Sequence, residues 1–294
     1  MHAIVTGGCG FIGGHLVDQL LSDGYRVTVI DNESAEANEE FYKNDKAVYH
    51  KISINDYDLI EPLFKGVDFV FHLAAESRIG PCIENPAMAC QTNVMGTCNV
   101  LQASRLNGVK RVIYSSTSAC YGLTDIIPMH ENLPMDNLNP YSTSKLGGQD
   151  LCNMYTKLYG LETISLRYFN VFGERMPETG QYAPVIAIFQ RQIRNGKNMT
   201  IVGDGLQKRD FVYVKDVVNA NITASLCDNK FCGTAYNVGT GKNITVLDIA
   251  KLLKKPYVHI APRAGEARNT KANIDKIKNI GWIPTVSVED WLIT

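Results

Sequence analysis

The sequence has little of what a nucleic-acid-binding protein or a membrane protein requires. Its 29 Lys and Arg residues are balanced by 30 Asp and Glu residues, so the formal net charge is -1. Without a long basic run, such a chain has nothing to attract a polynucleotide backbone. No apolar run approaches the roughly 18 residues that a membrane-spanning helix needs. We therefore expect neither a nucleic-acid partner nor a membrane.

Paired cysteines and clustered metal ligands are also missing. The 8 Cys include no CxxC pair, and the 6 His stand apart from one another and from acidic clusters. Structural zinc sites need such ligands at short, regular spacings. The first expected strand begins at His2 with no signal peptide ahead of it. We therefore expect reduced thiols, no metal site and a cytoplasmic location.

What the chain does have is a regular alternation of two patterns through its first half. The expected helices include Phe11 to Leu21, Ala87 to Leu106 and Tyr141 to Tyr159. The strands between them are β-branched or aromatic runs, expected at Ala3 to Thr6, Arg26 to Ile30, Phe69 to Leu73, Val112 to Ser115 and Thr163 to Leu166. This alternation is typical of βαβ units. It predicts an α/β fold with a Rossmann-type, doubly wound parallel sheet.

The sequence pattern changes after about residue 170, where Gly and Pro become more frequent and the expected elements become shorter. We expect a smaller α+β C-terminal lobe over the carboxyl ends of the strands, the edge at which open α/β sheets bind ligands. The predicted Rossmann domain comprises 1–168 and takes back about 211–238. The predicted substrate lobe comprises 169–210 and 239–294.

A glycine-rich stretch joins the first expected strand to the first helix. Gly7, Gly10 and Gly13 allow a tight turn, close approach of the backbone to a pyrophosphate, and close packing of helix on sheet. The helix N-terminus then offers free N–H groups and a favourable dipole to the phosphates. The second strand leads into Asp31, which can accept hydrogen bonds from a ribose 2′-OH and would repel a 2′-phosphate. The pattern predicts NAD as the cofactor.

Tyr141 and Lys145 lie four residues apart and share one face of a helix. A free tyrosine has a pKa near 10, so using it as a base near neutral pH requires a drop of roughly three units, or about 4 kcal/mol. A nearby cation supplies about one to three units, and an oxidised nicotinamide ring can add more. We predict that Lys145 and NAD together lower the pKa of Tyr141. The position of the pair, after the fourth strand and Thr117, favours catalysis.

These motifs together resemble the extended short-chain dehydrogenases/reductases of the NAD-dependent epimerase/dehydratase family, and among them the UDP-hexose 4-epimerases. The resemblance covers essentially the whole chain. The matching stretches are Thr6 to Gly13, Asp31-Asn32, His72 to Ala75, Asn93 to Asn99, Ser115 to Gly122, Pro140 to Lys145, Leu166 to Gly173, Gly203 to Gly205 with Arg209-Asp210, and Tyr236 to Gly239.

The resemblance implies which residues hold the cofactor. Two of these positions depart from the family pattern. Ser53 stands where an Asp usually bonds the adenine amine, and Ser77 stands where some epimerases carry a Lys that reaches toward the cofactor. The implied NAD-binding residues are Gly7, Gly10, Phe11, Ile12, Gly13, Asp31, Asn32, Ser53, Ile54, Leu73, Ala74, Ala75, Asn93, Ser115, Tyr141, Lys145 and Phe169.

The implied reaction is epimerisation of a nucleotide sugar at C4 through a transient 4-keto intermediate. Tyr141 would move the proton of the 4-OH, and Thr117 would bridge the same hydroxyl. Dehydratases of the family place an acid two residues after the catalytic threonine, whereas this chain has Ala119 there. Two alternatives stay open. One is another nucleotide-sugar enzyme, namely a UDP-uronate epimerase, a 2-epimerase or a 4,6-dehydratase; the other is a non-catalytic protein that binds NAD or a nucleotide sugar.

The resemblance also assigns a substrate site, with UDP-glucose and UDP-galactose as the expected substrates. A small residue at Thr270, where some relatives carry a bulky tyrosine, indicates that UDP-GlcNAc and UDP-GalNAc are accepted too. A guanidinium such as that of Arg209 suits a diphosphate because it offers two parallel donors. The implied substrate residues are Ser77, Thr117, Asn170, Val185, Phe189, Val202, Arg209, Arg263, Glu266 and Thr270. The resemblance further implies a homodimer built from the helices expected at Ala87 to Leu106 and Tyr141 to Tyr159.

Overall fold

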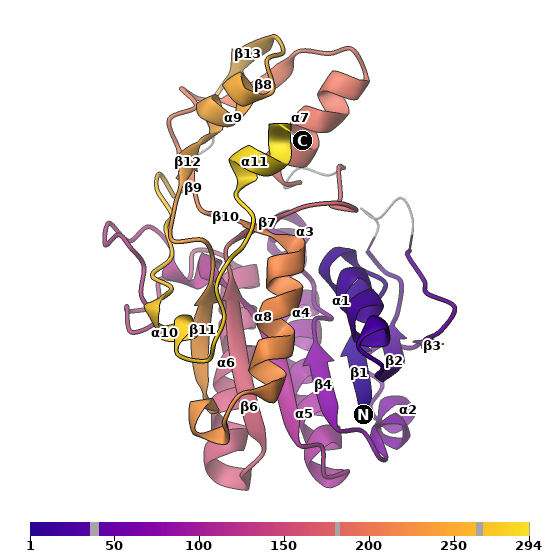
Figure 1. Cartoon of the computed structure of the whole chain (residues 1–294). Helices are drawn as coiled ribbons and strands as arrows, with labels where there is room; N and C mark the ends of the chain where they lie inside the picture. The colour runs from indigo at the N-terminus through magenta and orange to yellow at the C-terminus, as the bar shows by residue number, and fades with distance from the viewer. Residues whose placement is uncertain (36–40, 180–182, 263–266, 294) are drawn as a thin grey trace.

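The central sheet is parallel throughout, and the glycine-rich turn follows β1, the strand next to the middle one (Figure 1). The computed structural model describes residues 1–35, 41–179, 183–262 and 267–293. Within them, seven strands follow the order β11-β6-β5-β4-β1-β2-β3, and each neighbouring pair runs parallel. The strands are β1 (His2–Thr6), β2 (Arg26–Asp31), β3 (Val48–Lys51), β4 (Phe69–His72), β5 (Arg111–Thr117), β6 (Glu162–Tyr168) and β11 (Thr234–Val238). The predicted Rossmann-type sheet is confirmed, and its strand order reverses between β1 and β4, where such sheets bind ligands.

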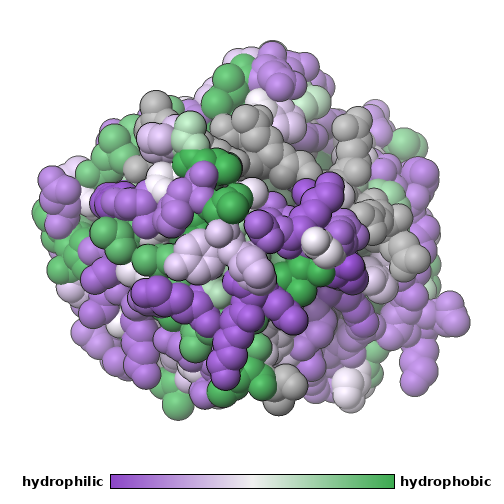
Figure 2. Space-filling model, turned by 90° about the horizontal axis from the view of Figure 1, so that it is seen from above, coloured by the Kyte–Doolittle hydropathy of each residue, from purple (hydrophilic) through white to green (hydrophobic). Residues whose placement is uncertain are grey.

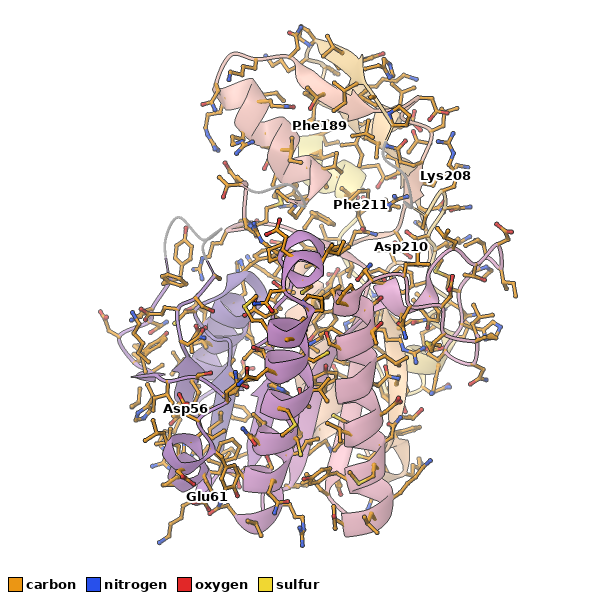
Figure 3. All side chains as sticks on the ribbon, turned by 180° about the vertical axis from the view of Figure 1, so that it is seen from behind. Asp56, Glu61, Phe189, Lys208, Asp210 and Phe211 are labelled. Atoms are coloured by element: carbon orange, nitrogen blue, oxygen red, sulfur yellow. The ribbon has the colours of Figure 1, made fainter. Side chains whose placement is uncertain are left out.

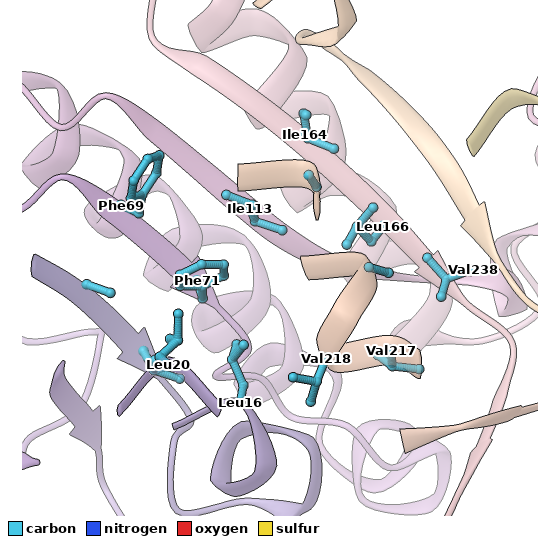
Figure 4. Packing of buried hydrophobic residues seen from close by; sticks show 14 of the residues in the cluster. Leu16, Leu20, Phe69, Phe71, Ile113, Ile164, Leu166, Val217, Val218 and Val238 are labelled. Atoms are coloured by element: carbon cyan, nitrogen blue, oxygen red, sulfur yellow. The ribbon is translucent and has the colours of Figure 1, made fainter. Parts of the chain in front are cut away.

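Helices cover both faces of this sheet. On one face, α1 (Phe11–Ser22) and α8 (Val214–Leu226) pack against each other and on the strands. Figure 4 shows this contact, in which Leu16 and Leu20 of α1 and Val217 and Val218 of α8 lie against apolar side chains of the sheet. The other face carries α2 (Tyr57–Ile60), η1 (Glu61–Phe64), α5 (Thr97–Leu106) and α6 (Pro140–Tyr159), whose apolar residues form a second cluster.

The helix expected over Ala87 to Leu106 is confirmed in its extent, but it is not uniform. The structure has α4 (Pro86–Cys90), then a π-helical segment η2 (Gln91–Gly96), then α5. The wider turns reposition the side chain of Asn93, which is 1% exposed and bonds to the loop after β4. π-Helical insertions within α-helices are frequent at functional sites. The hydrophobic period shows the helix but not this local widening.

Helix α6 is bounded by strong local signals. Asn139 accepts a hydrogen bond from the Ser142 backbone N–H, Ser142 caps Asn139 in return, and Pro140 occupies the first turn. At the other end Gly160 has φ +72°, the left-handed conformation that glycine adopts without strain. These signals set where Tyr141 and Lys145 stand relative to the sheet. The sequence analysis missed two short helices that pack against α6, α3 (Ile79–Glu84) and η3 (Ser118–Tyr121).

The remaining elements form a smaller lobe beyond the carboxyl ends of the strands (Figure 1). Its core gathers around Phe172, Phe189 and Ile201. Three two-stranded sheets cross it, β7 with β10, β8 with β13, and β9 with β12. The elements are β7 (Asn170–Phe172), α7 (Val185–Arg194), β8 (Met199–Val202), β9 (Lys208–Arg209), β10 (Phe211–Tyr213), β12 (Ile244–Thr245), α9 (Val246–Leu252), β13 (Tyr257–Ile260) and α11 (Val288–Ile293); η4 (Asn229–Phe231) and α10 (Asp275–Lys278) flank β11.

The surface seen from above carries interspersed hydrophilic and hydrophobic residues (Figure 2). None of the helices in the described ranges is both long and apolar enough to cross a membrane. Nor do the described residues contain a group of three or more His, Cys, Asp or Glu side chains that could hold a metal ion.

Candidate active site

A cavity of about 280 Å³ opens at the carboxyl ends of β1, β2, β4 and β5. Its wall brings together segments that are up to about 170 residues apart in the chain, because the carboxyl ends of parallel strands meet at one edge of the sheet. Most of the residues assigned from the sequence lie here, namely Gly7, Gly10, Phe11, Ile12, Gly13, Asp31, Asn32, Ser53, Ile54, Leu73, Ala74, Ala75, Ser77, Ser115, Tyr141 and Lys145.

The glycine-rich turn leaves no room for side chains at two positions. Gly7 has φ +72°, and a Cβ there would lie 2.7 Å from the Ala74 backbone nitrogen. A Cβ at Gly13 would lie 2.1 Å from the Gly7 carbonyl oxygen. The N-terminus of α1 is therefore held against the turn, with its free N–H groups at the cavity. This cradle fits a dinucleotide diphosphate.

Asp31 ends β2 at the cavity wall. One of its carboxylate oxygens accepts the Cys9 N–H at 2.9 Å, and the other accepts the Glu33 N–H at 2.8 Å. Each carboxylate oxygen has further lone pairs, so the side chain can also accept hydrogen bonds from ribose hydroxyls. The two backbone bonds orient the carboxylate, and the arrangement fits the ribose of NAD.

Tyr141 faces the cavity from the first turn of α6. Burial raises the pKa of Tyr141 above its usual value, and a hydrogen bond with the Thr117 side chain opposes that rise. The Thr117 hydroxyl also accepts the Ala119 N–H at 3.1 Å, which orients it at the end of β5. The cavity thus contains a phenol whose protonation depends on the neighbouring threonine.

The expected effect of Lys145 on Tyr141 is not found in the protein alone. Lys145 is 3% exposed, and burial lowers its pKa to about 7. Its Nζ lies 4.4 Å from the ring centroid of Tyr114, a cation–π arrangement. Desolvation penalises the ammonium and the phenolate alike, so the pKa of Tyr141 rises instead of falling. Both side chains line the same cavity, and the effect predicted for Lys145 and NAD together stays a prediction.

Two residues assigned to the cofactor do not line the cavity. Asn93 is buried, and its amide is occupied by hydrogen bonds to the backbone of Glu76 and to the Ser144 hydroxyl. Phe169 is 4% exposed and packs in a separate apolar cluster with Tyr121 and Met129. Both differences have the same cause. The sequence predicts a strand or helix, but it does not predict which way a residue near the end of that element faces.

Residues assigned to the substrate are spread over the second lobe. Phe189 is fully buried in that lobe's core (Figure 3), so its assignment to a nucleotide base was wrong. Val185 and Val202 are half-buried. Arg209 lines a second cavity of about 240 Å³ together with Thr240, Lys242 and the segment 284–290. Arg263 and Glu266 lie outside the described residues.

Asp210 joins the two parts of the molecule, at the level between them in Figure 3. It is fully buried, and its carboxylate accepts hydrogen bonds from Thr240, Gly241 and Ala272. Its carbonyl accepts two more from Asn170, and Thr270 contacts its N–H at 3.4 Å. Asn170 and Thr270 are thus held around Asp210, which the sequence analysis noted only as part of a motif.

The cavity also contains residues that the sequence analysis did not select, among them Glu76, Arg78, Thr92, Tyr168 and Pro177. Burial raises the pKa of Glu76 and lowers that of Arg78. A usable signal was present, since Glu76 and Arg78 follow a buried strand at the edge where ligands bind. Tyr168 and Pro177 carried no comparable signal.

Comparison with known proteins gives a consistent result. The model of the NAD dependent epimerase/dehydratase family matches residues 3–239. UDP-glucose 4-epimerase from Thermotoga maritima, solved with UDP-glucose, is 37% identical with a TM-score of 0.94, covering 100% of this chain and 96% of that one. UDP-N-acetylglucosamine 4-epimerase from Methanobrevibacter ruminantium M1, in complex with UDP-N-acetylmuramic acid, is 34% identical with a TM-score of 0.93, covering 99% and 96%. UDP-glucuronate 4-epimerase from Thermodesulfobacterium geofontis is 32% identical, covering 98% of this chain and 93% of that protein.

The fold and cavity define a Rossmann-type, NAD-using enzyme of the extended short-chain dehydrogenase/reductase class. The chain belongs to the NAD dependent epimerase/dehydratase family, whose similar members act on nucleotide sugars with different sugar parts.

Proposed function

We propose that this chain is a UDP-sugar 4-epimerase that interconverts UDP-glucose and UDP-galactose. The observation that carries the proposal is the Tyr141 phenol in the cavity, with a pKa that Thr117 lowers and one helical turn from the buried Lys145. Proton transfer to and from one hydroxyl needs no further acid or base. The presence of Ala119 two residues after Thr117 disfavours a dehydratase, because expulsion of a hydroxyl needs an acid near that position.

The residues around the glycine-rich turn would hold NAD. The N-terminus of α1 would meet the diphosphate, and Asp31 would accept the ribose hydroxyls, with Ser53 and Ile54 at the adenine end. What NAD supplies when bound is an acceptor, and later a donor, for the hydride at C4 of the sugar. Because that hydride is returned, net turnover needs no second substrate.

The chain's own residues manage the proton. Tyr141 in its phenolate form would remove the proton from the 4-OH as the C4–H bond breaks, leaving a 4-keto sugar and a neutral phenol. Thr117 would hydrogen-bond the 4-oxygen of the sugar and hold that oxygen beside the Tyr141 phenol. After the sugar presents its other face, the Tyr141 phenol would return the proton to the new 4-hydroxyl. The Lys145 ammonium would stabilise the phenolate, because opposite charges favour the ionised forms of both groups.

The second lobe would anchor the nucleotide, as predicted for 169–210 and 239–294. Arg209 and Asn170 are the proposed contacts with the substrate diphosphate. Binding energy from that remote end would keep the sugar within the site while it turns. Thr270 supports the acceptance of N-acetylated sugars, because its side chain is small and is held beside Asp210.

We also propose that two chains pair through the outer faces of α5 and α6. Leu106 and Leu158 on these helices are 57% and 65% exposed, and Tyr159 is 44% exposed. Exposed apolar side chains grouped on neighbouring helices favour an association surface. The eight cysteines are all free, which supports a reducing, cytoplasmic environment.

The test is conversion of UDP-galactose, and separately of UDP-N-acetylgalactosamine, by purified protein without added cofactor. Chromatographic separation of the C4 epimers should show an equilibrium mixture, and Tyr141→Phe should lower the rate by about 10²- to 10⁴-fold. The NAD content of the denatured variant serves as the control for an intact cofactor site. If protein that contains NAD converts neither substrate, the 4-epimerase proposal fails.

A further inference from the structure

Arg78 is a cation of the cavity wall that the proposed mechanism does not use. Its side chain is half-buried, and only it and Lys145 are cationic among the described residues that line the cavity. The described part of the protein offers its guanidinium no ion pair or hydrogen bond, and burial alone lowers its pKa. A guanidinium that loses water without gaining a partner is costly unless a ligand supplies the anion.

The backbone around Arg78 is held in a defined position. The buried Asn93 amide bonds both the N–H and the carbonyl of Glu76, two residues earlier. Arg78 itself is extended, with φ -114° and ψ 129°, and the Cys82 thiol donates back to the Glu76 carbonyl at 3.7 Å. Hydrogen bonds from Asn93 and Cys82 thus fix the loop at Glu76. Arg78 lines the same wall of the cavity.

The position of Arg78 favours the sugar end of the cavity over the cofactor diphosphate. Arg78 directly precedes α3, and α3 packs against α6, the helix that carries Tyr141 and Lys145. The cradle for the cofactor diphosphate lies instead at the N-terminus of α1, on the far side of β4 from α6 in the strand order. The contacts proposed for the substrate diphosphate are on the second lobe. The packing of the elements thus favours the sugar, over either diphosphate, as the partner of this guanidinium.

We propose that Arg78 binds a carboxylate carried by the sugar, so that the enzyme accepts UDP-linked hexuronates in addition to neutral hexoses. A planar guanidinium binds a carboxylate through two parallel hydrogen bonds, whereas a neutral hydroxymethyl group offers one weaker acceptor. Glu76 lines the same wall, and burial raises the pKa of its carboxyl group. This inference rests on the proposed function for its reaction but not for its binding contact.

The test compares UDP-glucuronate with UDP-glucose in wild-type protein, Arg78→Gln, Arg78→Lys and the control Lys65→Gln, which removes an exposed cation outside the cavity wall. Calorimetry measures binding of each nucleotide, and chromatography measures C4 epimerisation. Loss of a charge-assisted contact should lower the uronate-to-hexose ratio of affinities, and of kcat/KM, by about 10- to 100-fold in Arg78→Gln. Arg78→Lys should retain part of the ratio, and Lys65→Gln should retain all of it.

Several results would overturn the inference. One is a wild-type protein that does not bind UDP-glucuronate. Another is an Arg78→Gln protein that weakens both nucleotides equally, which would place the guanidinium on the substrate diphosphate. A loss of NAD from Arg78→Gln would place it on the cofactor. Because the binding measurement needs no turnover, selective uronate binding without epimerisation of any sugar would overturn the proposed function and leave this inference standing.

Discussion

The side-chain amide of Asn93 bonds the backbone of Glu76 at both ends, with its oxygen 2.8 Å from the Glu76 nitrogen and its nitrogen 3.0 Å from the Glu76 oxygen. The same Asn93 nitrogen donates to the Ser144 hydroxyl, which donates to the Tyr141 carbonyl. One buried side chain therefore connects the loop after β4 with the first turn of α6. The relative position of the cavity wall and of Tyr141 depends on this connection.

Asn93→Leu should destabilise the fold and lower activity. It leaves the Glu76 N–H without its Asn93 acceptor and leaves the Glu76 carbonyl with only the weak Cys82 thiol donor, at a cost of about 1–3 kcal/mol for an unsatisfied group. Denaturant unfolding gives the stability, and epimer separation gives the rate. The matched control is Asn153→Leu, because the buried amide oxygen of Asn153 has no hydrogen-bond partner in the described part of the chain. Equal effects of the two substitutions would show that the Asn93 connection has no special role.

Gly13→Ala should abolish NAD retention, whereas Gly14→Ala should not. The new Cβ at Gly13 would lie 2.1 Å from the Gly7 carbonyl, so the turn must open. At Gly14 the nearest atom lies 3.7 Å away at the end of the Arg175 side chain, and alanine in a helix is worth about 0.5–1 kcal/mol over glycine. Absorbance of nucleotide released on denaturation measures NAD content. A Gly13→Ala protein that keeps its NAD would refute the proposed cradle.

Thr117→Val should shift the acid limb of the pH–rate profile to higher pH. The hydrogen bond from Thr117 opposes the rise in the pKa of Tyr141, so its removal raises that pKa further and a smaller fraction is phenolate at a given pH. We expect kcat to fall by about 10²-fold or more and to recover in part at alkaline pH. Thr117→Ser keeps the hydroxyl and should keep the profile. An unshifted limb in Thr117→Val would mean that the threonine does not control the phenol.

Lys145→Met should abolish activity and yet stabilise NAD-free protein near neutral pH. Burial lowers the pKa of Lys145 from 10.5 to about 7, so between these values the unfolded chain binds a proton that the folded chain does not. The stability of the wild type should therefore rise with pH across this window. The destabilisation caused by burying Lys145 is largest below pH 7. The free energy of unfolding of Lys145→Met should exceed that of the wild type by a few kcal/mol at pH 6, and this difference should vanish toward pH 10.5. Unfolding curves at several pH values measure it, and a constant difference would contradict the assigned pKa.

Local patterns in the sequence were enough to predict the class of fold and the chemistry of the site. The Gly7 to Gly13 turn needs glycine for steric reasons alone, and Asn139-Pro140 with Gly160 sets the ends of α6 through local hydrogen bonds. Alternation of strand and helix periods requires parallel strands, and parallel strands bring their carboxyl ends to one edge. Tyr141, Lys145 and Asp31 were predicted for one site because of these short-range rules.

Only the tertiary structure determined which way side chains face and how their surroundings shift their pKa values. Asn93, in a π-helical segment, bonds Glu76 instead of lining the cavity, and Phe189 proved to be core because β8 and α9 pack against α7. The pKa values of Tyr141 and Lys145 depend on how much water the packed elements exclude, which no spacing in the sequence expresses. Arg78 was identified as a site residue only in the folded structure, where it lines the cavity and the residues outside 36–40, 180–182, 263–266 and 294 offer its guanidinium no partner. Burial and pairing arise between elements distant in the chain, and for that reason only the folded structure could determine them.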